Sequence, residues 1–227
     1  ITERLVGSEM CIRDRYYLDM VDIVTHNNFL DEEIIQLVDD LDTPVESFFD
    51  HPHGVFKGAE TSRHQWFGVE SDLGKALVAR LQNLSYFKDS LVDGMQVADM
   101  IKPYDVHSDY IVTKKQVPIS DPSKATPDYT TIIPLVSGEN KTVIFDQKAD
   151  YNDFDEYKSK NKMTDSTPES VWESLCGHCH DEDRRYLTIK SVIDWRMGDL
   201  FAFNRLYFHS SANFAKPKRA IVVWSSR

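Results

Sequence analysis

The residues with the clearest chemical potential are His107 and Asp109, which are separated by one residue in the segment IKPYDVHSDY. On an extended strand, side chains two residues apart point to the same face, so both can bind one cation. Alone, a His-x-Asp triplet is weak evidence, because the same residues often occupy a surface turn. A further histidine, His209, follows 100 residues after Asp109.

The context of His209 strengthens the metal-site interpretation. A Gly-Asp turn at Gly198 and Asp199 precedes an apolar strand, His209 follows it, and Arg219 enters the last strand. This order, together with the upstream His-x-Asp, resembles the 2-oxoglutarate-dependent iron oxygenase family, and most closely its prolyl-4-hydroxylase-like branch. The resemblance covers most of the chain in element order, but it is specific only at the three candidate ligands and Arg219.

The resemblance implies that His107, Asp109 and His209 are the catalytic residues and hold Fe(II) as a facial triad. Three metal positions then remain for two oxygens of 2-oxoglutarate and for O2. Ascorbate is a further candidate cofactor. Arg219, ten residues after His209, matches the family's basic residue that pairs with the distal carboxylate of 2-oxoglutarate. Three weaker candidates for cosubstrate binding, each equally compatible with ordinary barrel packing, are Tyr104, Tyr129 and Thr131.

Two neighbouring lysines compete with Arg219 for the carboxylate. Alternation along the strand places Arg219 on the face of Ile221 and Val223 and places Lys218 on the other face. We expect the Ile221 face to point into the barrel, which favours Arg219 over Lys216 and Lys218. The sequence departs from the family pattern at Ile221, where a serine often stands.

By resemblance, the expected reaction is hydroxylation of a C–H bond in a peptidyl (for example prolyl) or small-molecule substrate, with release of succinate and CO2. Asp109 favours hydroxylation over halogenation, because halogenating members lack this carboxylate. Desaturation or cyclisation of a small metabolite is the alternative within enzymes. A non-catalytic metal-binding jelly-roll module is the alternative from another class.

The elements that must position these residues change in type along the chain. Residues 27–41 and 71–84 have apolar residues at helical spacing behind Asp31 and Ser71 as N-caps. Six β-rich segments then follow, at residues 96–104, 129–136, 141–147, 186–195, 199–208 and 219–226. This order predicts a mainly β, α+β fold: a double-stranded β-helix (jelly-roll, cupin-like barrel) with the N-terminal helices packed on one face.

Residues 5–14, LVGSEMCIRD, resemble the translation of a common sequencing adapter, so we expect residues 1–15 to be a library artefact of a metagenomic sample. Residues 16–227 are then expected to form a single oxygenase domain, with residues 148–185 as an insert or lid.

Composition indicates a soluble protein in the cytoplasm of a bacterium or a virus-infected host cell. Acidic residues outnumber basic ones by 37 to 26, which disfavours nucleic acid as a partner. No apolar run approaches the roughly 20 residues needed to span a bilayer, so no membrane partner is expected. Three cysteines provide no disulfide framework. The expected partner is the peptide or small-molecule substrate, and the pattern gives no oligomeric state.

The segment CGHCH, residues 176–180, offers a second possible metal site. Its spacing matches both a c-type haem attachment motif and a set of zinc ligands. Haem would require export, whereas zinc could fasten the acidic insert, and an ordinary loop remains the main alternative. His51, His53 and His64 are expected to be loop residues, although this aromatic-rich stretch could border the substrate entrance.

Overall fold

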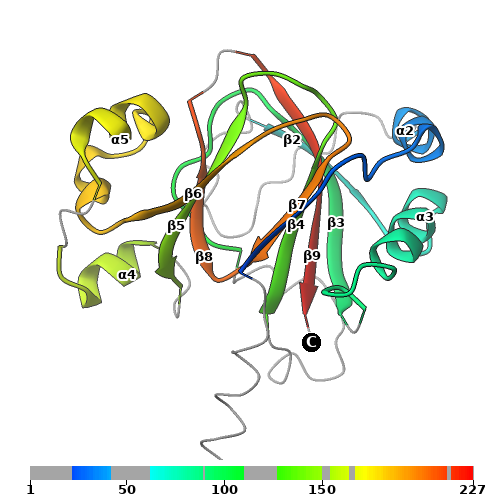
Figure 1. Ribbon diagram of the computed structural model, residues 1–227, viewed down its shortest axis with the longest axis horizontal. Helices are drawn as coiled ribbons and strands as arrows, with labels where there is room; N and C mark the ends of the chain where they lie inside the picture. Colours follow the sequence, from blue (N-terminus) through cyan, green and yellow to red (C-terminus); the bar gives the residue numbers. More distant parts are fainter. Residues whose placement is uncertain are drawn as a thin grey trace, which may run out of the picture.

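The structure is a computed structural model in which two antiparallel β-sheets face each other (Figure 1). It describes residues 22–41, 62–88, 90–109, 127–149, 154–163, 167–213 and 216–226. The expected adapter at residues 1–15, His51 and His53 lie outside these ranges. No helix in the described ranges is long and apolar enough to cross a membrane.

The larger sheet has six strands and the smaller sheet has three, with all neighbours antiparallel. In spatial order the major sheet consists of β1 (Ile23–His26), β7 (Leu200–Asn204), β4 (Pro127–Pro134), β9 (Lys218–Ser226), β3 (Leu91–Met100) and β2 (Ser62–Phe67). The minor sheet consists of β6 (Ile189–Asp194), β5 (Lys141–Lys148) and β8 (Tyr207–Ser211). This arrangement confirms the expected double-stranded β-helix, although the two sheets do not close into a continuous barrel.

The segment expected as one strand at residues 199–208 forms two strands in different sheets. β7 ends at Asn204, and its side-chain Oδ1 accepts a hydrogen bond from the backbone N–H of Leu206 at 2.9 Å. The chain turns there and enters the minor sheet as β8. Strands β1 and β2 were not expected from the sequence.

Two helices cover the outer face of the major sheet (Figure 1). Helix α2 (Glu32–Asp39) is capped by Asp31, and helix α3 (Asp72–Leu81) is capped by Ser71, as predicted. Their apolar residues and the outward side chains of the sheet form one cluster, which includes Ile34, Val38, Leu73, Leu77, Leu81, Met95, Val97, Ile133, Ile221 and Val223.

Three short helices lie against the minor sheet, on the opposite side of the molecule (Figure 1). They are α4 (Phe154–Lys160), α5 (Glu169–Cys176) and the 3-10 helix η2 (Asp181–Arg185). Trp172 and Cys176 of α5 are buried in one cluster with Val143, Phe145 and Phe208 of the minor sheet. The helices within residues 148–185 are therefore packed against the minor sheet rather than separate from it.

A third apolar cluster fills the space between the two sheets. Its members are Ala98, Met100, Ile132, Ile144, Trp195, Phe201, Phe203, Tyr207 and Ala220, drawn from both sheets. Because successive side chains on a strand alternate between faces, the central strands of the major sheet are buried on both sides. One face packs on the helices and the other packs in the interior of the sandwich.

Arg205, in the turn between β7 and β8, is the most buried cation in the described part of the chain, with no exposed side-chain surface. Its Nη1 donates to Asp93 Oδ2 at 2.5 Å and to the backbone oxygen of Ser225 at 2.9 Å. Its Nε and Nη2 donate to the backbone oxygen of Asp109, at 3.3 and 3.0 Å. One guanidinium thus connects β3, β9 and the His-x-Asp segment.

We expect Asp93→Asn to destabilise the protein strongly, because it removes the counter-charge of a fully buried guanidinium. Removing one partner of a buried ion pair costs about 3–5 kcal/mol. Urea unfolding measures this free energy. The control is Glu70→Gln, which removes an ion pair with Lys75 whose side chains are 61% and 88% exposed and which should change stability by less than about 0.5 kcal/mol. Equal effects of the two substitutions would contradict the structural role of Arg205.

Candidate metal and cosubstrate site

The structure brings His107, Asp109 and His209 together. Their ligand atoms all lie within 4.8 Å of one another. His209 Nε2 lies 3.5 Å from Asp109 Oδ2, and the two imidazole rings are 4.3 Å apart between centroids. His209 lies on β8, whereas His107 and Asp109 follow β3, so the site forms only when the two sheets face each other.

Backbone carbonyls orient both imidazole rings. Nδ1 of His107 lies 2.7 Å from the carbonyl oxygen of Asp105, and Nδ1 of His209 lies 3.1 Å from that of Tyr207. Since a carbonyl oxygen only accepts hydrogen bonds, each Nδ1 is the protonated nitrogen of its ring. The lone pair is therefore on Nε2 in both residues, which is the arrangement that second-sphere carbonyls impose on metal-binding histidines.

The surroundings of His209 and Asp109 favour the protonation states that bind a cation. Burial, followed by the neighbouring His107, lowers the pKa of His209 to about 4, so its imidazole is neutral at neutral pH. Burial raises the pKa of Asp109, but the two histidines, the hydroxyl of Thr130 and Arg205 lower it more, to below its usual value. Thr130 and Arg205 exert this effect even when the histidines are neutral. A neutral imidazole and an ionised carboxylate are the forms that bind metal.

Two backbone contacts fix how the histidines approach each other. His107 N–H donates to the His209 oxygen at 3.0 Å, and His209 N–H donates to the His107 oxygen at 2.8 Å, which makes an isolated antiparallel bridge. The Thr130 hydroxyl donates to Asp109 Oδ2 at 2.6 Å and thereby holds the carboxylate from β4. Both sheets therefore position the ligand set.

The three candidate ligands line a pocket between the sheets. Tyr104 also lines this pocket, and its hydroxyl lies 2.8 Å from His64 Nε2, so its role in cosubstrate binding stays a prediction. His64 lies on strand β2 and lines the pocket, so the expectation that it is a loop residue was wrong, whereas a role at the substrate entrance stays a prediction. The other lining side chains are Gln96, Ala98, Met100, Thr130, Ile132, Thr142, Trp195, Ser210, Ser211, Val222 and Trp224.

Tyr129 and Thr131 are placed differently from the expectation. Tyr129 belongs to the apolar cluster beneath α2 and α3, where its ring packs edge-on against Tyr86 at 5.1 Å. Thr131 is buried on that same outer face of β4, and among the described residues neither side chain lines the pocket. Thr130, between them, faces inward and contacts Asp109.

Arg219 also lies on the outer face, contrary to the orientation expected from the sequence. It pairs with Asp99 across β3 and β9, and its Nε lies 3.4 Å from the Asp99 carboxylate. The predicted alternation with Ile221 and Val223 is present, but these two residues pack beneath the helices. Because both faces of β9 are covered, apolar neighbours do not reveal which face is the interior.

Lys218 instead shares the inner face with Val222 and Trp224, which line the pocket. Its side chain is 1% exposed, and its Nζ donates to the backbone oxygen of Lys141 at 2.7 Å. The ammonium lies 4.7 Å from the ring centroid of Trp195, another pocket residue. Burial lowers the pKa of Lys218 to about 7.

Sequence reasoning missed Thr130 and Arg205 as residues of the site. Arg205 had a usable signal, since a lone arginine within the apolar segment DLFAFNRLYF is a buried-charge candidate. Thr130 had none, because a threonine in a strand is ordinary.

Comparisons with known proteins identify the fold. No protein-family model and no curated protein sequence matches this chain. Among solved structures, the non-haem α-ketoglutarate-dependent epimerase SnoN from nogalamycin biosynthesis matches with a TM-score of 0.54 at 14% identity, over 96% of this chain and 82% of SnoN. HygX from Streptomyces hygroscopicus, solved with nickel and 2-oxoglutarate bound, matches with a TM-score of 0.53 at 12% identity, over 94% of this chain and 86% of HygX.

A third similar structure is the non-haem α-ketoglutarate-dependent carbocyclase SnoK, with a TM-score of 0.50 at 12% identity, over 93% of this chain and 81% of SnoK. At such identities the similarity establishes the fold and leaves the reaction open. The matches nevertheless extend over nearly the whole chain, through both sheets and the helices on either side. This chain therefore has the fold of the 2-oxoglutarate/Fe(II) oxygenases.

Proposed function

We propose that this chain is an Fe(II)- and 2-oxoglutarate-dependent oxygenase that hydroxylates a C–H bond of a small-molecule or peptidyl substrate and releases succinate and CO2. The observation that supports this most directly is the ligand set. Two imidazoles with Nδ1 bound to carbonyls and one ionised carboxylate converge on a single point. This two-histidine, one-carboxylate set suits Fe(II) and leaves coordination positions open.

In this proposal His107 Nε2, His209 Nε2 and an Asp109 oxygen hold the iron. Iron with bound 2-oxoglutarate and O2 would supply the oxidising power for attack on a C–H bond. The rest of the protein binds and orients the reactants. Trp195, Val222 and Trp224 enclose the pocket and limit the access of water, whereas His64 and Tyr104 form a hydrogen-bonded pair in its wall.

We propose Lys218, in place of Arg219, as the partner of the distal carboxylate of 2-oxoglutarate. It is the basic residue at the start of β9 whose side chain lies on the pocket side of the strand. A carboxylate that reaches the ammonium would restore the charge that burial disfavours, through a charge-assisted hydrogen bond. The Lys218 ammonium overlies the ring of Trp195, which lines the pocket, and this contact supports binding of the cosubstrate at this end.

The proposal leaves several reaction outcomes to product analysis. SnoN and SnoK, which are an epimerase and a carbocyclase, share this fold. Mass spectrometry of a turned-over substrate distinguishes the outcomes, because hydroxylation adds one oxygen atom, cyclisation removes two hydrogens and epimerisation leaves the mass unchanged. A pool of small metabolites and proline-containing peptides is the first screen. The rival reading, a metal-binding module without turnover, requires that no member of the pool yields succinate.

Anaerobic titration with Fe(II) and then 2-oxoglutarate should produce a visible metal-to-ligand charge-transfer band, because the cosubstrate chelates the bound metal. The His209→Ala variant should lose both iron binding and the band, since a buried ligand is removed. His180→Ala is the control, because His180 is exposed and outside the triad. Iron binding by wild-type protein without a band would favour the non-catalytic alternative.

Lys218→Met should weaken 2-oxoglutarate binding with little change in iron binding, because it removes the proposed partner of the distal carboxylate. A charge-assisted hydrogen bond is worth about 1.5–3 kcal/mol, or roughly 10–150-fold in Kd. Arg219→Met is the matched control on the opposite face of the same strand and should change this Kd by less than about twofold. Calorimetric titration of the Ni(II)-loaded proteins measures both values. A large increase in Kd for Arg219→Met with little change for Lys218→Met would instead assign carboxylate binding to Arg219.

The affinity for 2-oxoglutarate should also fall as pH rises above neutrality. Because the pKa of Lys218 is lowered to about 7 in the ligand-free protein, its amine is mostly neutral above this pH and must take up a proton to bind a carboxylate. Linkage then raises Kd by up to about tenfold per pH unit. Calorimetric titrations in buffers of different ionisation enthalpy measure how many protons the protein takes up when 2-oxoglutarate binds. The Lys218→Arg variant, whose guanidinium stays charged, should show no such uptake; uptake that persists in it would contradict the assignment.

A further inference from the structure

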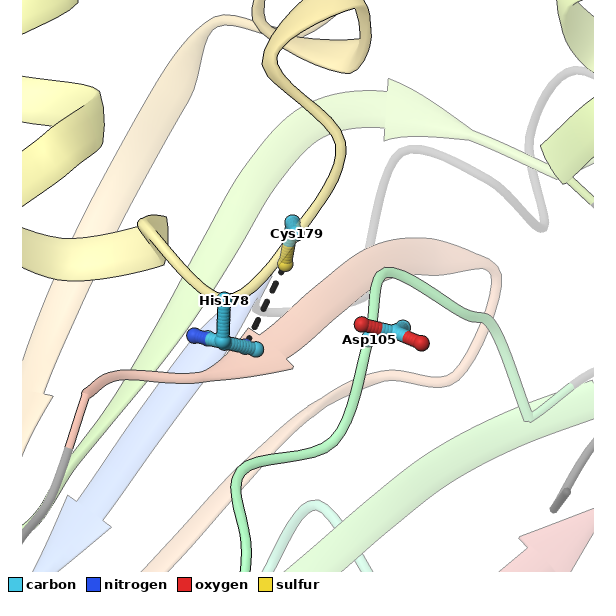
Figure 2. A group of neighbouring side chains, drawn as sticks. All are labelled: Asp105, His178 and Cys179. Carbon is cyan, nitrogen blue, oxygen red and sulfur yellow. Dashed lines mark hydrogen bonds between the residues drawn. The ribbon is translucent and has the colours of Figure 1, made fainter.

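His178 lies outside the candidate ligand set, in the segment that follows helix α5, yet it contacts Tyr104, three residues before His107, and Ser210, which follows His209. Figure 2 shows it beside Cys179 and across from Asp105, which lies on the segment leading to His107. Its Nε2 lies 2.9 Å from the backbone oxygen of Tyr104 and 3.1 Å from the hydroxyl of Ser210.

The hydrogen-bond partners determine which protons the His178 ring holds. On the Nδ1 side, Asn213 Oδ1 lies at 2.8 Å. The orientation of this amide is fixed, because Asn213 Nδ2 donates to the backbone oxygens of Glu173 and Ser174 at 3.0 and 3.2 Å. Nδ1 therefore donates to an oxygen. On the other side, the Tyr104 carbonyl can only accept, so Nε2 donates as well. His178 is thus an imidazolium that donates to Asn213 and to the Tyr104 carbonyl, with the Ser210 hydroxyl and the Cys179 sulfur also beside Nε2, at 3.1 and 3.2 Å (Figure 2).

These contacts connect helix α5 to the two segments that carry the histidine ligands. Tyr104 immediately precedes Asp105, whose carbonyl oxygen orients His107. Ser210 immediately follows His209 and donates to the same Tyr104 oxygen at 2.8 Å. The Tyr104 carbonyl therefore accepts hydrogen bonds from His178, which follows α5, and from Ser210 on β8. The next residue, Asp105, orients the His107 ring through its own carbonyl.

A second metal site is the competing explanation, since ligand atoms of Asp105, His178 and Cys179 lie within 4.8 Å of one another. A histidine that binds metal must offer the lone pair of one ring nitrogen. Both ring nitrogens of His178 face oxygen acceptors that require a proton there.

We propose that His178 is a positioning residue of the iron site: by donating to the Tyr104 carbonyl and to Asn213, it fixes the backbone that orients His107. An effect of His178 on catalysis rests on the proposed function. An effect of His178 on metal affinity requires only that His107, Asp109 and His209 bind a metal. It also gives the helical segment after residue 148 a role in the site, because His178 follows α5 and its partner Asn213 is bound to the backbone of that helix.

The test compares Co(II) affinity, from the visible cobalt spectrum, in wild-type protein and two variants. Outer-sphere substitutions of this kind typically lower metal affinity by about 10–100-fold, and we expect this of His178→Ala. His178→Gln retains one donor that can reach Tyr104 and should have an intermediate affinity; it also replaces the alanine variant if that variant does not fold. His180→Ala, two residues further along the same segment, should match wild type.

The outcomes separate this inference from the proposed function. Equal Co(II) affinity in wild type and both His178 variants overturns the inference. One equivalent of zinc that remains in His209→Ala protein but is lost in Cys179→Ser protein also overturns it, in favour of a second metal site. Wild-type protein that binds Co(II) but shows no 2-oxoglutarate band with iron overturns the proposed function alone, because the cobalt comparison does not use the cosubstrate.

Discussion

The buried guanidinium of Arg205 is the constraint on which the arrangement of the site depends. A cation with no exposed surface is stable only if its donors meet oxygens, and here those oxygens come from Asp93, Ser225 and the backbone of Asp109. Asp93 is itself held by the Ser226 hydroxyl at 2.7 Å. The turn between the two sheets, the end of β9 and the carboxylate ligand are therefore fixed relative to one another by one charge, because none of these groups can move without leaving it unpaired.

The metal ligands gain their orientation from backbone groups. Carbonyl oxygens at Asp105 and Tyr207 hold the two Nδ1–H groups, and the antiparallel bridge between the histidines sets their spacing. Such contacts cost little to form, because these carbonyls would need hydrogen-bond donors in any case. In the proposed iron site, two neutral imidazoles and one carboxylate would leave a divalent ion with one net positive charge, which would favour a dianionic cosubstrate in the remaining positions.

The strands of the major sheet have two buried faces with different functions. Outward side chains such as Val97 and Ile221 join the sheet to α2 and α3, whereas inward ones such as Gln96 and Val222 line the pocket. A change of one residue in register would exchange these sets and move Lys218 away from the pocket. The packing of α2 and α3 on the outer face thus stabilises the strand register that directs the pocket side chains inward. The same packing therefore stabilises both the apolar core and the site.

The sequence alone predicted the fold class, the two capped N-terminal helices, most of the later strands and the three candidate ligands that the structure brings together. His-x-Asp spacing is local, and the N-caps and alternating apolar residues act over a few positions, so these features are visible without a structure. The outcome at β9 shows the limit of that reasoning. Alternation correctly separated Lys218 from Arg219, but only the tertiary structure decided which of them faces the pocket, because a strand covered on both sides has apolar neighbours on both sides. Arg205, Thr130 and His178 likewise acquire their roles from partners far away in sequence: the closest contacts of Arg205 with Asp93 and of His178 with Tyr104 span 112 and 74 residues. No local pattern encodes such contacts, since they exist only once the sheets and α5 have packed.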